Sequence, residues 1–484
     1  MDSSKDVNSI RNILKNTSVF GGVQILQILI NLVRGKFIAL FLGPDGIGIN
    51  ALYVSATNTI QQLASCGINL SIVKEIATRK DDEDRLKKFI GIATKLILLT
   101  ALLGIAICVL FSPALSKFTF GDLDHIMAFI ALSAMMFFAI AGAGYLSILQ
   151  GLHYVKVISK ASIVSSLAGL VIGVPFYYLW GIRGIIPALI ASSLSLFVFY
   201  YLSFRKTTYY DTISVRLKDN LPIIKNVFKL GAVLVISSLI GSTMYYLLYV
   251  FIRNQGSAEA VGYFQSANSI TNQYVGLVFS AMSLEYFPRL AACADDNQKI
   301  SDLVNKQIIV VSNITAPLVC ILITTAPIVI RLLLTEEFIV IIPLVRWLAL
   351  GLIFRAIAFP LGYITFAKGN KKRFFWLEGI LGNFLYFTIS IALYQASGLI
   401  GLGFGLSVIY FTYFLILYLV NHKWYKYNLS NKTFLQLMIA ITFDAICLGI
   451  SLIFEGYKSY AVMSVLTILS IVTAYFSLKR ASKS

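Results

Sequence analysis

The sequence predicts an all-α integral membrane protein with about 14 transmembrane helices, and three observations predict it. Hydrophobic residues make up 58% of the 484 residues and charged residues only 13%, about half of the charged share of an ordinary soluble domain. Apolar runs long enough to cross the hydrocarbon core, about 20 residues, recur along the chain. Basic residues gather in alternate loops between these runs. A bilayer can solvate apolar surface that one soluble core could not bury.

The apolar runs give the predicted spans in chain order. The first half contains spans at 17–42, 46–72, 89–111, 124–150, 157–180 and 183–204. The second half contains spans at 229–253, 259–285, 306–334, 338–366, 374–395 and 398–421, and two more follow at 434–454 and 459–478. We expect the first run to be a retained span, because residues 1–16 are polar and the run is too long for the hydrophobic region of a signal peptide.

Lysine and arginine residues predict the orientation of the spans. If the N-terminus lies inside, the dense basic clusters at 74–88, 205–229 and 368–373 all fall in inner loops. The outer loops then hold only Lys117, Arg183, Arg253 and Lys458. This asymmetry follows the positive-inside rule, so both termini are predicted to be cytoplasmic. It also accounts for most of the net charge of +18. Basic residues dispersed over many short loops argue against nucleic-acid binding.

Two pairs of glycine-containing segments indicate an internal duplication. Residues 181–188 read GIRGIIPA and residues 398–405 read GLIGLGFG, a match at a spacing of 217. Residues 46–57 read GIGINALYVSAT and residues 260–271 read AVGYFQSANSIT, with a glycine match at a spacing of 214. Nearly equal offsets predict two repeats of six spans each. Because six is even, both repeats enter the membrane in the same direction, as in one class of transporters whose substrate path lies between the halves.

The duplication predicts the domain organisation. Residues 1–204 form an N-terminal six-helix bundle, and residues 205–228 form a cytoplasmic linker. Residues 229–421 form a C-terminal six-helix bundle, and the two bundles surround a central cavity. Residues 422–484 add two transmembrane helices outside the duplication.

Polar side chains within the spans are candidate substrate-binding residues. Gln24, Gln27, Asn31 and Arg34 lie within an arc of about 80° on one face of the first span. Such a stripe does not face lipid, because each unpaired amide or charge is costly there. We expect it to line a hydrophilic cavity, although hydrogen bonds between neighbouring helices are the alternative. The second and eighth spans repeat the pattern with Asn58, Gln61, Gln62 and Ser65 and with Gln265, Asn268 and Asn272.

The charges predicted to lie within the membrane are mainly positive. Arg34 lies in the outer half of the first span, Arg355 lies near the middle of the tenth, and Arg346 lies nearer its outer end. Arg346 and Arg355 are nine residues apart, so a regular helix points them about 180° apart. A cationic cavity suits an anionic substrate, and arginine binds phosphate through two parallel hydrogen bonds. Carboxylates are fewer, at Glu285, Glu378 and Asp444, and none of them stands out as a coupling site.

Catalysis and metal binding have little support in the sequence. The five cysteines and three histidines are scattered, and no pair has metal-ligand or redox-motif spacing. No catalytic triad, zinc motif or glycine-rich phosphate loop is present. We therefore expect no catalytic residue, no bound metal and no enzyme activity.

The chain resembles the polysaccharide-biosynthesis flippases. The segments FLGPDGIGINALY and GIRGIIPALI, together with twelve core spans in two halves, look like the O-antigen and capsule "Wzx-type" members of the multidrug/oligosaccharidyl-lipid/polysaccharide exporter superfamily. The resemblance covers roughly residues 10–425. It implies an alternating-access transporter that moves an undecaprenyl-diphosphate-linked oligosaccharide from the inner to the outer leaflet of a bacterial inner membrane. It also implies cationic cavity residues, here Arg34, Arg355 and Arg346.

The resemblance leaves several points open. It implies possible coupling to a proton or sodium gradient, and possible partnership with a polysaccharide polymerase and a chain-length regulator. Alternatives within the superfamily are a peptidoglycan lipid-precursor flippase and a multidrug exporter. Exporters of cationic drugs tend to need carboxylates in the cavity, and the mainly positive charge within these spans argues against that alternative. A membrane-embedded glycosyltransferase is disfavoured, because every outer loop is short.

Overall fold

The computed structural model describes residues 3–210, 215–454 and 456–481, with side chains from Gly22 onward apart from short stretches of two helices. The described residues are almost all helical. They form two compact units, residues 1–254 and residues 255–484. The all-α membrane fold predicted from the sequence is confirmed.

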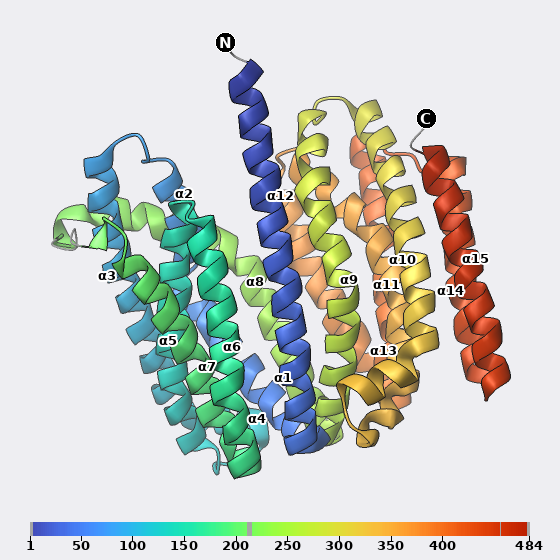
Figure 1. The fold of residues 1–484 in the computed structure, drawn as a ribbon, viewed down its shortest axis with the longest axis horizontal. Coiled ribbons are helices and arrows are strands. Elements are labelled where there is room, and N and C mark those ends of the chain that lie inside the picture. Colours follow the sequence, from blue (N-terminus) through green and yellow to red (C-terminus); the bar gives the residue numbers. More distant parts are fainter. Residues whose placement is uncertain (1–2, 211–214, 455, 482–484) are drawn as a thin grey trace. The chain divides into compact units, whose positions relative to one another are not determined.

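Unit 1 contains the first eight helices, drawn from blue to light green in Figure 1. The long helices pack around an apolar core between α2, α3 and α5. Short 3₁₀ turns at Gly181–Gly184 and Lys218–Asn220 join helices of this unit. The helices are α1 (Ser3–Ser65), α2 (Ile68–Ala77), α3 (Glu83–Leu110), α4 (Ser112–Phe120), α5 (Ile126–Gly151), α6 (Val155–Trp180), α7 (Ile185–Arg205) and α8 (Leu221–Gln255).

Helix α8 packs within unit 1. The hydroxyl groups of Tyr246 on α8 and Thr119 on α4 are 2.5 Å apart. Arg253, near the end of α8, donates a hydrogen bond to the carbonyl oxygen of Phe120. These contacts explain why the compact unit extends beyond residue 204 to include the helix that follows the basic segment.

Unit 2 contains the remaining helices, whose core lies between α10, α11, α13 and α14. A π-helical turn, Phe375–Leu381, joins α12 to α13. A 3₁₀ turn at Glu336–Ile341 precedes α11. The helices are α9 (Ala258–Ala292), α10 (Asn297–Leu333), α11 (Ile342–Ala367), α12 (Lys371–Phe374), α13 (Gly382–Tyr425), α14 (Asn431–Ile453) and α15 (Tyr457–Ala481).

Ten stretches of the described residues are long and apolar enough to cross a membrane. Three of them have 44, 51 and 55 residues, at least twice the roughly 20 residues that one crossing needs. Each of these three is interrupted where two predicted spans meet, at Gly43, Gly181 and Gly398. Helix α9, with 35 residues, is not among the ten, because its described residues form no run long enough to be tested. The count of fourteen spans stays a prediction.

The duplicated glycine motif forms the same local structure in both units. Gly181 has φ 54° and ψ −129°, and Gly398 has φ 60° and ψ −140°, a left-handed conformation that glycine adopts at little cost. Three residues on, a Cβ at Gly184 would overlap the carbonyl oxygen of Phe176, and a Cβ at Gly401 would overlap that of Leu393. Phe176 and Leu393 are themselves separated by 217 residues. This agreement in backbone geometry supports the duplication.

We predict that Gly184→Ala and Gly401→Ala each destabilise the protein by about 1–3 kcal/mol, because the added methyl group meets a backbone oxygen. The measurement is the midpoint of thermal unfolding of the detergent-solubilised protein. Gly449→Ala in α14 is the control, since its Cβ would meet no atom within 4 Å and alanine favours helix. Equal midpoints for Gly401→Ala and Gly449→Ala would contradict the prediction.

Candidate functional site

Arg355 lies near the middle of α11, half-buried among polar and aromatic groups of unit 2. Its Nη1 donates a hydrogen bond of 2.5 Å to Oδ1 of Asn272 on α9. The guanidinium also lies 5.2 Å from the ring centroid of Phe279 and 5.7 Å from that of Tyr410, within the range of cation–π attraction. Among the described residues, no carboxylate forms an ion pair with Arg355. Its positive charge is therefore available to an anion.

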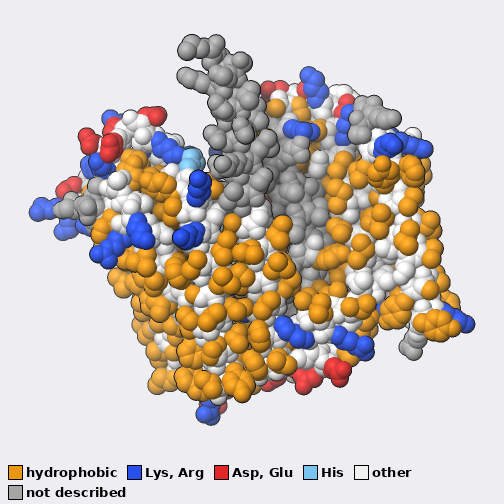
Figure 2. Space-filling view, in the orientation of Figure 1, with side chains coloured by type: hydrophobic (Ala, Val, Ile, Leu, Met, Phe, Trp, Pro, Cys, Tyr) orange, Lys and Arg blue, Asp and Glu red, His pale blue; other side chains and the backbone are white. Residues whose placement is uncertain are grey.

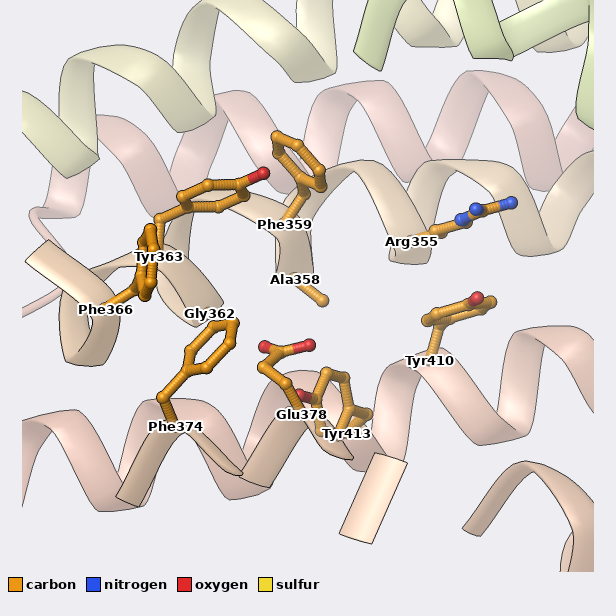
Figure 3. A pocket seen from close by; sticks show the side chains of 10 residues that line it. All are labelled: Arg355, Ala358, Phe359, Gly362, Tyr363, Phe366, Phe374, Glu378, Tyr410 and Tyr413. Atoms are coloured by element: carbon orange, nitrogen blue, oxygen red, sulfur yellow. The ribbon is translucent and has the colours of Figure 1, made fainter. Parts of the chain in front are cut away.

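Arg355 lines a pocket of about 350 Å³ between α11, the π-helical turn and α13. Figure 3 shows the guanidinium and Tyr410 toward one end of the pocket and the carboxyl group of Glu378 pointing into it beside Gly362 and Tyr413. Aromatic rings from α11 and α12 form much of the remaining wall. We call this set the Arg355 pocket; its lining is Arg355, Ala358, Phe359, Gly362, Tyr363, Phe366, Phe374, Glu378, Tyr410 and Tyr413.

The π-helical turn positions Glu378. Extra residues in a helical turn rotate the side chains and leave carbonyl groups without their usual partners, and such turns are frequent at functional sites. Here Nδ2 of Asn383 donates to the carbonyl oxygen of Gly379 at 2.9 Å and to that of Glu378 at 3.4 Å. The Tyr413 hydroxyl donates to the carbonyl oxygen of Leu377 at 3.4 Å. These side chains stabilise the turn that directs Glu378 into the pocket.

Gly362 makes room for the Glu378 carboxyl group. A Cβ at position 362 would overlap Oε1 of Glu378. The contacting atom is the far end of a flexible side chain, so a larger residue would displace the carboxyl group without breaking the helix packing. Glycine at this position therefore determines where the carboxylate lies.

Predicted site residues of α9 connect to the Arg355 pocket. Asn272, which accepts from Arg355, donates from Nδ2 to Oδ1 of Asn268 at 2.7 Å. Gln265 lies further along the helix and donates to Ser269 Oγ at 3.1 Å. The structure therefore brings Asn268, Asn272 and Arg355 into one hydrogen-bonded chain, with Gln265 about two turns from Asn272.

Arg346 lies on a different side of α11 from Arg355. It is buried, with Nε donating to the carbonyl oxygen of Ile323 on α10 at 3.3 Å and Nη1 to that of Ser451 on α14 at 2.9 Å. The two arginines thus contact different helices, as their nine-residue spacing predicts. Arg346 does not line the Arg355 pocket, and its role in binding substrate stays a prediction.

The other predicted site residues belong to unit 1. Arg34 on α1 is half-buried and donates from Nη2 to Ser192 Oγ on α7 at 3.1 Å. Gln24, Asn31 and Asn58 are exposed, and Gln27 is half-buried. Exposed amides in an apolar helix need a polar neighbour or water, so these residues remain candidates for lining a substrate path.

Sequence reasoning missed most of the Arg355 pocket. Aromatic residues carry no signal in a chain in which they make up 13% of the residues, so Phe359, Tyr410 and Tyr413 could not be singled out. Glu378 was visible as a carboxylate within a span, but its contact with Gly362 depends on the packing of two helices. Among the described residues, no three histidine, cysteine or acidic side chains are grouped so as to hold a metal ion.

The chain matches known membrane proteins along most of its length. A family model described as polysaccharide biosynthesis protein matches residues 13–294. The Lipid III flippase of Escherichia coli (strain K12) is 23% identical over 401 residues, which cover 81% of this chain and 93% of that protein. The solved structure of the lipid II flippase MurJ in an inward closed conformation aligns with a TM-score of 0.72 at 16% identity, covering 97% of this chain and 100% of that chain.

A multidrug transporter shares the fold as well. The inward-facing structure of a multidrug resistance MATE family transporter of the MOP superfamily aligns with a TM-score of 0.69 at 19% identity. The alignment covers 83% of this chain and 94% of that chain. At these identities, the structural matches establish the fold.

We predict that Arg355 and Asn272 are energetically coupled by about 0.5–1.5 kcal/mol, the range for hydrogen bonds between transmembrane helices. The measurement is a double-mutant cycle of Arg355→Ala and Asn272→Ala, with unfolding followed in mixed micelles. The control cycle pairs Asn272→Ala with Arg346→Ala, whose guanidinium binds other helices; these effects should add to within about 0.5 kcal/mol. Additive effects in the first cycle would contradict the contact.

Proposed function

The chain belongs to the polysaccharide biosynthesis protein family, and on that premise we propose that it is a flippase for a lipid-linked glycan. The proposed substrate is an undecaprenyl-diphosphate-linked oligosaccharide, an O-antigen or other surface polysaccharide repeat unit. The protein would move it from the inner to the outer leaflet of a bacterial inner membrane by alternating access, with both of its termini in the cytoplasm. The observation that carries the proposal is the charge of Arg355, which pairs with no carboxylate among the described residues and is held at a pocket within a membrane-embedded unit.

The chemistry of the Arg355 pocket suits a diphosphate sugar. A guanidinium group donates two parallel hydrogen bonds to a phosphate and keeps its charge at any physiological pH. The hydroxyl groups of Tyr410 and Tyr413, which line the pocket, are neutral hydrogen-bonding groups that can replace the water around a sugar. Aromatic rings offer flat apolar faces against which the apolar faces of a sugar ring can pack.

The division between headgroup and lipid tail makes a polar pocket sufficient for transport. Transfer of the diphosphate and sugars from water into bare hydrocarbon has a strongly unfavourable free energy, because their polar groups would have no hydrogen-bond partners there. The polyprenyl tail is stabilised by the same hydrocarbon and needs no protein cavity. No bond is made or broken, so the protein acts as a transporter and not as an enzyme.

We also propose that Glu378 couples transport to a proton or sodium gradient. Its carboxyl group faces the same pocket as Arg355. An ionised carboxylate there repels an anionic diphosphate, whereas a neutral carboxyl group or one paired with Na⁺ does not. Ion binding and substrate binding are therefore linked, and by reciprocity the substrate favours the ion-bound state.

The proposed substrate implies partners in the same membrane. A translocated repeat unit has to be polymerised at the outer face, so we propose that a polysaccharide polymerase and a chain-length regulator act next to this protein. The alternatives are a peptidoglycan lipid-precursor flippase and a multidrug exporter, which have the same architecture but different cargo. They differ in the phenotype of a deletion strain, which provides the test.

We predict that deletion of the gene in its host abolishes surface polysaccharide and causes undecaprenyl-linked oligosaccharide to accumulate in the inner leaflet. Wild type should restore the polysaccharide, whereas Arg355→Ala should lower it on the order of tenfold or more, because a charged hydrogen bond to the diphosphate is lost. Arg355→Lys keeps the charge but loses the paired geometry, so an intermediate level is expected.

Arg183→Ala serves as the control, because this arginine is exposed and lies outside the pocket. All variants are compared at equal protein levels in the membrane. Intact surface polysaccharide with raised drug sensitivity would assign the protein to the multidrug exporters. Arrested growth with accumulated peptidoglycan precursor would assign it to the precursor flippases.

We predict that Gly362→Ala impairs transport as strongly as Glu378→Gln, because its methyl group displaces the carboxyl group from the pocket. Transport in proteoliposomes with an imposed proton or sodium gradient should be several-fold faster than without one for wild type, and should lose that dependence in both variants. Gly449→Ala, which meets open space in α14, should keep it. Retained gradient dependence in Glu378→Gln would refute the proposed coupling role.

A further inference from the structure

Unit 1 contains a groove of about 570 Å³ between α6 and α7. It lies where α6 begins, at Val155, and where α7 ends, at Arg205. The groove therefore opens at one membrane surface and not at mid-depth. Its polar lining comprises Tyr154, Lys160, Ser203, Lys206, Thr207 and Thr208, and its apolar lining comprises Val157, Ala161, Val164, Phe199 and Leu202.

Two ammonium groups from different helices face this groove. Lys160 belongs to α6 and Lys206 caps the end of α7, and both side chains are exposed. Within the part of the chain that the structure describes, neither lysine forms an ion pair. The Thr207 hydroxyl donates to the carbonyl oxygen of Phe204 at 2.7 Å, and its oxygen can still accept. The groove thus offers two cations and several hydroxyls to an anion.

The apolar wall continues from the cations toward the middle of the helices. Val164 lies one turn beyond Lys160, about 6 Å deeper along α6, and Phe199 lies about 10 Å from Lys206 along α7. Val157 and Leu202 are exposed, at 38% and 42%. Figure 2 shows lysine and arginine side chains gathered at one end of unit 1 next to a broad hydrophobic surface. Charge at the membrane surface and apolar walls below it match the two parts of a lipid molecule.

We propose that this groove binds one anionic glycerophospholipid from the leaflet at that end of α6 and α7. Its phosphate would lie between Lys160 and Lys206, and one acyl chain would follow Leu202, Val164 and Phe199. Basic pockets between transmembrane helices bind anionic headgroups in this way. The positive-inside rule assigns this end to the cytoplasm. A free phosphate ion would use the cations but not the wall, so the apolar lining favours a lipid.

The test uses the purified full-length protein and native mass spectrometry. Dioleoylphosphatidylglycerol is the probe, dioleoylphosphatidylcholine is the zwitterionic comparison, and inorganic phosphate is the competitor. The Lys160→Gln/Lys206→Gln variant should bind phosphatidylglycerol at least about tenfold more weakly than wild type, because two cations next to the phosphate are lost. Wild type should prefer phosphatidylglycerol, and millimolar phosphate should not displace it.

Two further variants keep the result interpretable. Lys156→Gln/Lys225→Gln removes the same charge from exposed positions outside the groove and should bind like wild type. Leu202→Trp keeps both lysines but fills the apolar wall at an exposed position, so it should weaken lipid binding while leaving the unfolding temperature unchanged. Equal losses in both lysine pairs, or displacement by phosphate, would overturn the proposal. Wild-type affinity in Lys160→Gln/Lys206→Gln would overturn it too.

Discussion

The structure depends on one constraint, which is that a bilayer offers the backbone no hydrogen-bond partner. Every amide and carbonyl within the hydrocarbon must therefore be satisfied by the chain itself. In the part of the chain that the structure describes, long helices satisfy them. The helices break where glycine allows it, at Gly43, Gly181 and Gly398. Several helices begin with side-chain caps, as at Asp82, where the carboxylate accepts from the amide of Arg85. The same requirement explains the π-helical turn, whose displaced carbonyls are bound by a nearby asparagine.

The same constraint separates two kinds of buried polar side chain. Arg346 is held by backbone carbonyls of α10 and α14, and the buried Asp444 accepts from Cys320 Sγ at 3.2 Å. These contacts join the additional helix α14 to the core of unit 2, as interhelical hydrogen bonds do in membranes. Arg355 differs, because its partners are one neutral amide and two aromatic faces. A cation held in this way stays ready for an anion that enters the pocket.

Both proposed sites combine cations with apolar or aromatic surface, but at different depths. The Arg355 pocket surrounds one guanidinium with rings in the interior of unit 2, which suits a headgroup taken out of water. The groove of unit 1 places two flexible ammonium groups at a helix end beside aliphatic side chains, which suits a lipid that stays in its leaflet. Arginine supplies directed, paired hydrogen bonds, whereas lysine supplies charge with little directional demand. The choice of cation therefore follows the task of each site.

The sequence by itself determined the fold class and the breaks at Gly43, Gly181 and Gly398, because hydropathy, basic loops and glycine act locally along the chain. The duplication stays a prediction. It also predicted Arg355, Asn268 and Asn272 as candidate site residues, since polar residues are rare in apolar spans. Only the tertiary structure decided which polar residues meet. Arg355 and Asn272 are 83 residues apart in the chain yet share a hydrogen bond. Glu378 enters the pocket because a glycine on another helix leaves it room. Such contacts depend on how helices pack. Where almost every residue of a helix is apolar, the sequence has no hydrophobic periodicity that would show which face packs against which neighbour.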